Sequence, residues 1–123
     1  MDERLSTTIE REVTSWLGVT VTTHSMGGGL EFRYGRVELG HLHGDACADL
    51  PFTRKIRDEL IATGRASVHP PLPDSGWVRR EIAGSEDIAG VVALFRRNYD
   101  RASARATSPA GAAEGATASP NAE

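Results

Sequence analysis

The feature that most restricts the fold is an alternating segment at residues 36–50. Four of its side chains recur at every second position, which on a β-strand would place them on one face: Val37, Leu39, His41 and His43. The residues between them would point to the other face: Glu38, Gly40 and Leu42. Gly44-Asp45 favours a turn and 47–50 a short return strand, so the segment predicts a hairpin in which one row ends in two imidazoles.

The remaining patterns predict helices on both sides of this hairpin. Apolar residues at steps of three and four indicate a helix over 5–17, a second opened by Pro51 and ended by Gly64, and a third capped by Ser85. Further strands are predicted from β-branched or alternating residues at 19–24, 30–34 and 77–82. Short connections between the early strands favour hairpins. We therefore expect a single α+β domain, with an antiparallel sheet of four to five strands packed with three helices.

Composition sets the expected domain limits. Residues 104–123 are rich in Ala, Ser, Pro and Gly and contain no aromatic residue. Such a segment cannot bury enough apolar surface to offset the entropy of ordering, so we expect a disordered tail there. Residues 1–103 would form the folded domain.

Charge and hydropathy argue against several partners. The formal net charge is -3, whereas a nucleic-acid-binding domain is normally strongly basic. No run of about 18 apolar residues is present, and residues 1–17 are amphipathic rather than signal-like, so neither a membrane span nor a leader is expected. The single cysteine excludes an internal disulfide framework and suits the reducing cytoplasm.

The two histidines of the hairpin are the first candidates for chemistry. Imidazoles two apart on a strand lie close enough to hold one ligand, and histidine is the usual base near neutral pH. The alternative is that one ring is buried and hydrogen-bonded while the other is merely exposed. A metal would need a third ligand, for which four residues are available: Asp45, Asp49, His69 and Asp74. Their spacing matches no established zinc signature, so we expect no metal.

A second candidate region is the proline-rich loop at residues 69–76, which can hold polar groups rigidly. It contains His69, Asp74 and Ser75 and leads into Trp77. The alternative is that Trp77 belongs to the core and the loop is only a turn. Ser75 lacks the surrounding glycines of a nucleophile elbow, which argues against a hydrolase. Other polar residues, including Cys47 and the arginines at 79, 80, 96, 97 and 101, are expected to be structural or solvated.

These motifs, taken in order, resemble one family. The resemblance rests on Glu38-Leu-Gly-His-Leu-His43, Asp49-Leu-Pro-Phe52, His69-Pro70, Pro73-Asp-Ser-Gly-Trp77 and Tyr99. The sequence is similar to the small bacterial luciferase-like domain proteins, which share a domain with the fungal bioluminescence luciferase. That enzyme oxidises a hydroxylated pyrone with molecular oxygen. It is longer than this chain and carries an amino-terminal membrane anchor, for which no counterpart is visible here.

The resemblance implies an oxidase or oxygenase that acts on a small enol or phenolic molecule without a bound cofactor. His41 or His43 would be the base, His69 would stabilise the anion, and Asp74 or Asp45 would orient a histidine. Trp77, with Phe32 or Phe52, would wall the pocket. The remaining expected substrate-binding residues are Glu38, Asp49 and Ser75. The alternative is a non-catalytic module that binds a small molecule or a protein, and under either hypothesis we expect neither a nucleic acid nor a membrane as partner.

Overall fold

The computed structural model describes residues 4–23 and 29–107. The elements follow in this order: α1 (Leu5–Thr14), β1 (Val19–Thr23), β2 (Leu30–Tyr34), β3 (Val37–His43), β4 (Cys47–Pro51), α2 (Arg54–Ala62), β5 (Ser67–Val68), β6 (Trp77–Glu81), the 3₁₀ turn η1 (Ser85–Asp87) and α3 (Ile88–Thr107). The predicted hairpin is present as β3 and β4. The tail predicted from residue 104 overlaps the last turn of α3, and residues 108–123 lie outside the described part.

The strands form one antiparallel sheet in the order β1-β2-β3-β4-β6-β5. The predicted α+β class is confirmed, with six strands in the described residues rather than four or five. The extra strand is β5, whose two residues are too short to leave a pattern in the sequence. β4 lies between β3 and β6, so its backbone is paired on both sides.

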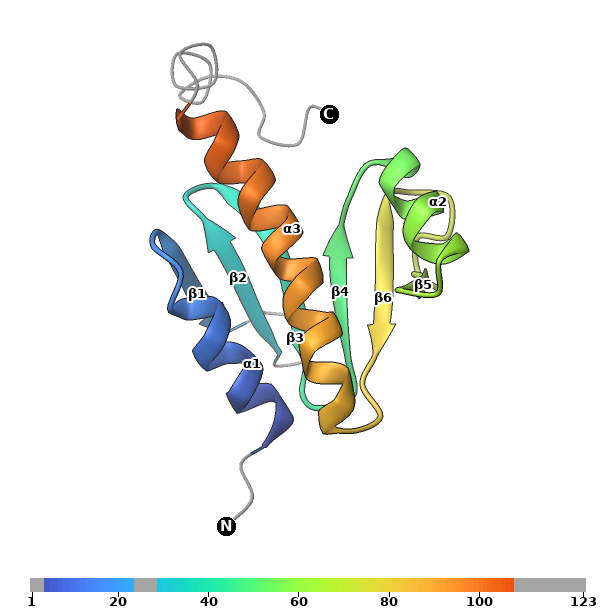
Figure 1. Cartoon of the computed structure of the whole chain (residues 1–123), viewed down its shortest axis with the longest axis horizontal. Helices are drawn as coiled ribbons and strands as arrows, with labels where there is room; N and C mark the ends of the chain where they lie inside the picture. The colour runs from blue at the N-terminus through green and yellow to red at the C-terminus, as the bar shows by residue number, and fades with distance from the viewer. Residues whose placement is uncertain (1–3, 24–28, 108–123) are drawn as a thin grey trace.

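The helices create the main core by packing on one face of the sheet. Figure 1 shows α1 and α3 side by side in front of the strands, and α3 contacts β2, β3 and β4. Fully buried apolar side chains fill the layer between them, including Phe32, Leu39, Leu50, Val78 and Phe95. No helix among the described residues is long and apolar enough to cross a membrane.

A β-bulge in β3 overturns the predicted division of its two faces. Phe32 of β2 pairs with Gly40 and Arg33 pairs with Glu38, so Leu39 is an extra residue without a partner in the ladder. Leu39 therefore joins Leu42 in the core, whereas Glu38 comes to the same side as His41. The prediction that Leu39 shares the histidine face was wrong, because simple alternation fails at a bulge.

Gly40 makes the bulge possible. Its φ of +150° is one that L-residues rarely adopt, and a Cβ atom there would lie 2.9 Å from the Asp49 carbonyl oxygen and from side-chain atoms of Leu50 and Phe95. The backbone of β3 thus passes directly beneath α3, where only glycine leaves enough room.

Two predicted helix starts also differ in the structure. Pro51 ends β4 instead of opening α2, and the Thr53 hydroxyl caps α2 by accepting from the Ile56 N–H at 3.1 Å. Before α3, the Asp87 carboxylate rather than Ser85 accepts backbone N–H groups, from Ala83 and Gly84. In both places a later side chain provides the cap.

Candidate functional site

The site is built on the face of the sheet opposite the main core. Asp49 lies between Ala48 and Leu50, which belong to the core, so strand alternation turns its side chain to the other face. The strand register sets His41 of β3 opposite Asp49 and Asp49 opposite Arg79 of β6. Three neighbouring strands therefore carry a row of imidazole, carboxylate and guanidinium.

Asp49 is the centre of this arrangement and is only 1% exposed. The Arg79 Nε donates to Oδ1 at 2.8 Å, and its Nη2 donates to Oδ2 at 3.0 Å. Three imidazoles approach Oδ2 through their Nε2 atoms: His43 at 2.9 Å, His69 at 3.1 Å and His41 at 3.5 Å. We call these three histidines with Asp49 and Arg79 the imidazole cluster.

The rings of the imidazole cluster are held by further contacts. His41 Nδ1 lies 2.9 Å from a carboxylate oxygen of Glu38, and because a carboxylate only accepts, His41 donates there. The Trp77 ring packs against His41 and His69 at centroid distances of 5.4 and 5.7 Å. His69 is buried, and its Nδ1 has no hydrogen-bond partner among the described residues.

These contacts change the acidity of the cluster. Burial alone would lower the pKa of His41, but hydrogen bonds to Asp49 and Glu38 outweigh it and raise the pKa to about 9. Burial alone would raise the pKa of Asp49, but hydrogen bonds from His41 and Arg79 hold that pKa well below the usual range of an aspartate. Asp49 is therefore negatively charged and is surrounded by basic side chains. Nearby, burial raises the pKa of the Cys47 thiol, which keeps it protonated.

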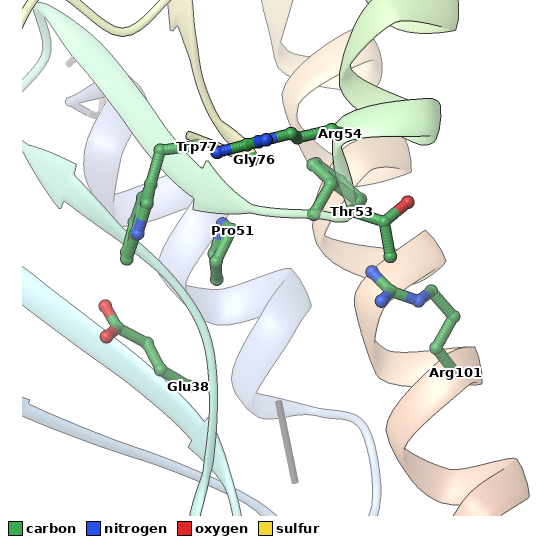
Figure 2. Close-up of a pocket in the computed structure, with 8 residues that line it drawn as sticks. Glu38, Pro51, Thr53, Arg54, Gly76, Trp77 and Arg101 are labelled. Atoms are coloured by element: carbon green, nitrogen blue, oxygen red, sulfur yellow. The ribbon is translucent and has the colours of Figure 1, made fainter. Parts of the chain in front are cut away.

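A pocket of about 510 Å³ adjoins the cluster where β4 ends and β6 begins. It is lined by Glu38, Pro51, Phe52, Thr53, Arg54, Gly76, Trp77 and Arg101. Figure 2 shows Glu38 beneath the Trp77 ring, with Arg101 reaching in from α3. Glu38 and Trp77 line the pocket and also contact His41 of the imidazole cluster, so they connect the pocket with the cluster.

The chain matches the family model of the luciferase domain over residues 36–98. This range includes more than half of the chain and every residue of the imidazole cluster. The chain belongs to the luciferase domain family. No curated protein and no solved structure matches it.

The luciferase domain brings together six of the residues expected from its sequence: Glu38, His41, His43, Asp49, His69 and Trp77. The predicted meeting of the paired histidines with the proline-rich loop thus occurs, and it does so around Asp49. Of the two phenylalanines expected as alternative pocket walls beside Trp77, Phe52 lines the pocket, whereas Phe32 is fully buried against Phe95 in the core.

Three expected residues lie elsewhere in the luciferase domain. Asp45 is exposed on the β3–β4 turn, where it accepts the Ser6 backbone N–H at the start of α1. Asp74 is exposed on the proline-rich loop and does not line the pocket. The Ser75 hydroxyl donates to the Leu72 carbonyl and accepts the Trp77 N–H, which are the contacts of a turn. Roles at the site for these residues stay predictions without a contact to support them.

Arg79 is the site residue that sequence reasoning missed. It was expected on a solvated face, but its side chain is 23% exposed and bound to Asp49 through two nitrogens. Strand alternation in residues 77–81 places Arg79 on the same face as Trp77. This pattern would indicate that Arg79 belongs to the site, but only once β6 is known to lie next to β4. That neighbourhood depends on a crossover through α2 and β5, which the local pattern does not reveal.

The luciferase domain also has a group of donors suited to a metal ion. One ligand atom from each of His41, His43 and Asp49 lies within 4.8 Å of the others. Two imidazoles and one carboxylate are a donor set used by divalent transition metals. The cluster can thus hold either protons or a cation, whereas the pocket beside it has a volume within the range of small-molecule sites.

Proposed function

We propose that this luciferase domain oxidises a small enol or phenolic molecule with molecular oxygen in the pocket beside the imidazole cluster. The observation that carries the proposal is the position of Glu38, which lines the pocket and is hydrogen-bonded at 2.9 Å to His41. A carboxylate tied to a group of imidazoles is well placed to take a proton from a bound molecule. Membership of the luciferase domain family supports oxygen as the oxidant.

The pocket lining suits a planar molecule that becomes an anion. Trp77 and Phe52 provide aromatic surfaces for a ring, while Arg54 and Arg101 add positive charge to the same wall. Glu38 would remove the proton of the hydroxyl group, and the arginines would stabilise the resulting enolate or phenolate. Such an anion is richer in electrons than the neutral molecule and reacts more readily with oxygen.

This assignment gives the role of base to Glu38 instead of His41 or His43. The histidines are not among the residues that line the pocket, whereas Glu38 is. His41 acts through Glu38, because its Nδ1–H donates to the carboxylate and fixes the orientation of that group. His69 is buried behind Trp77 and would hold Asp49 rather than contact the substrate.

Oxygen uptake tests the proposal. Wild type, Glu38→Gln and the control Glu12→Gln are assayed with a panel of hydroxypyrones and polyphenols. Glu12 is exposed on α1, so its substitution removes the same charge away from the pocket. We expect uptake by wild type and Glu12→Gln, and a loss of about 100-fold or more in Glu38→Gln, the usual contribution of a general base.

Two outcomes would contradict this proposal. Uptake by Glu38→Gln at the wild-type rate would remove Glu38 as the base. Binding of a panel compound by wild type without any uptake above the protein-free rate would instead support a non-catalytic binding module.

A further inference from the structure

We propose that His41, His43 and Asp49 form a binding site for a divalent first-row transition-metal ion. The three residues lie on the adjacent strands β3 and β4, and their ligand atoms converge within 4.8 Å. This departs from the expectation of no metal, which relied on the spacing of residues in the sequence. Binding of the ion does not depend on the proposed oxidation. Only the choice of iron(II) as the ion rests on that proposed function.

The first argument is the crowding at one oxygen atom. Oδ2 of Asp49 faces four nitrogens, from His43, His69, Arg79 and His41, at 2.9, 3.1, 3.0 and 3.5 Å. A carboxylate oxygen has about two lone pairs, and Arg79 uses one. Three imidazoles then share the other, which is more than hydrogen bonding alone satisfies well. An ion between His41, His43 and Oδ2 would convert two competing nitrogens into ligands and leave His69 as the remaining imidazole donor.

The second argument is distance. Two ligand atoms that are each about 2.1 Å from the same ion lie about 3.0 to 3.4 Å apart when adjacent, and about 4.2 Å apart when opposite. His43 and His41 lie 2.9 and 3.5 Å from Oδ2, close to the spacing of adjacent ligands. The remaining separation, between the His41 and His43 ligand atoms, is within 4.8 Å, and side-chain rotations would have to shorten it to the spacing of adjacent ligands, as three ligands on one side of an ion require.

The third argument is the set of groups behind the ligands. Glu38 accepts the Nδ1–H of His41, so the Nε2 nitrogen faces Asp49 and offers its lone pair once an ion displaces the Nε2 proton. A carboxylate behind a histidine in this way is the usual support of a metal-bound imidazole. Arg79 similarly fixes the carboxylate of Asp49 through both oxygens.

Charge favours a cation at the same place. Once the ion has displaced the proton that His41 carries at neutral pH, Asp49 and Glu38 carry two negative charges against the single positive charge of Arg79. A divalent ion would compensate this excess in a region where Asp49 is almost fully buried. Two histidines and one carboxylate with open coordination positions are the donor set of non-haem iron(II) oxygenases, so iron(II) is the ion that would serve the proposed oxygen reaction.

The test uses the full chain without a histidine tag, after removal of metals with a chelator. Titration with Co²⁺ followed by visible absorption, and calorimetry with Zn²⁺ and, without oxygen, Fe²⁺, should each show one equivalent bound. His43→Ala and Asp49→Asn should lose at least about 10-fold in affinity, since they remove ligands. The exposed Asp58→Asn on α2 is the matched control and should bind like wild type.

His43 keeps the test valid if Asp49→Asn fails to fold. Its side chain is 33% exposed, so His43→Ala is expected to keep the wild-type circular dichroism spectrum. Absence of stoichiometric binding, or equal affinity in folded His43→Ala and wild type, would overturn the metal site. A failed titration with oxygen uptake still dependent on Glu38 would reject the metal alone. A bound metal without any uptake would reject the oxidation alone.

Discussion

The two faces of the sheet stabilise their buried side chains in different ways. On the face covered by α1 and α3, β4 contributes Ala48 and Leu50 to an apolar core. On the other face the residue between them, Asp49, is equally buried but is surrounded by one guanidinium and three imidazoles. Apolar contacts tolerate small changes in shape, whereas a buried charge depends on every partner. The comparison teaches that β4 is fixed from both sides, by packing on one and by ion pairing on the other.

The largest effect is expected from Asp49→Ala. Its removal leaves Arg79 and the cluster imidazoles without their shared anion, so we expect a loss of roughly 3–5 kcal/mol in the free energy of unfolding. Urea denaturation followed by circular dichroism measures it. A loss below about 1 kcal/mol would mean that the polar face does not stabilise the fold as its geometry indicates.

Leu50→Ala tests the apolar face next to it. Leu50 is fully buried, so truncation should cost about 3 kcal/mol through lost transfer energy and the cavity left behind. The same denaturation experiment applies, and unchanged binding of Co²⁺ would separate this variant from Asp49→Ala. If Leu50→Ala abolished metal binding while the protein remained folded, the two faces would not be independent.

Gly40→Ala tests the bulge that joins the two faces. The added Cβ would meet Asp49, Leu50 and Phe95 at 2.9 Å, and the φ of +150° would be strained, so we expect a loss of about 2 kcal/mol. The Glu38–His41 contact should weaken as well, which oxygen uptake would reveal. Gly35→Ala, with a positive φ but open space around it, controls for backbone strain alone and should cost less.

Asp45→Ala should have the smallest effect and separates Asp45 from Asp49, the other aspartate of the hairpin. Asp45 caps α1 through the Ser6 N–H, so its loss should cost about 1 kcal/mol and leave oxygen uptake and metal binding unchanged. The hydrogen bond from Ser6 lowers the pKa of Asp45, so its contribution is present above the unfolded value and disappears as pH falls through the lowered one. Wild type and variant should therefore converge in stability at acidic pH, and a constant difference down to about pH 2 would contradict the cap.

Much of the fold follows from local patterns, because helical and strand periodicities are local properties. The faces of α1 and α3 and the hairpin of β3 and β4 were predictable in this way. The bulge at Gly40 was not, since it depends on how closely α3 approaches β3. The sequence named the histidines and Asp49 as candidates, but the pairing of Asp49 with Arg79 requires knowledge of which strands are neighbours.

The bulge in β3 also has a consequence for how this strand tolerates insertions and deletions. It changes the parity of the strand, so odd-numbered side chains enter the core before Gly40 and even-numbered ones after it. Deleting Leu39 would remove the bulge and leave a regular ladder in which Glu38 and His41 keep their present face. Deleting a residue elsewhere in β3 would instead turn the side chains on one side of the deletion to the opposite face, so the strand tolerates a one-residue deletion best at the bulge.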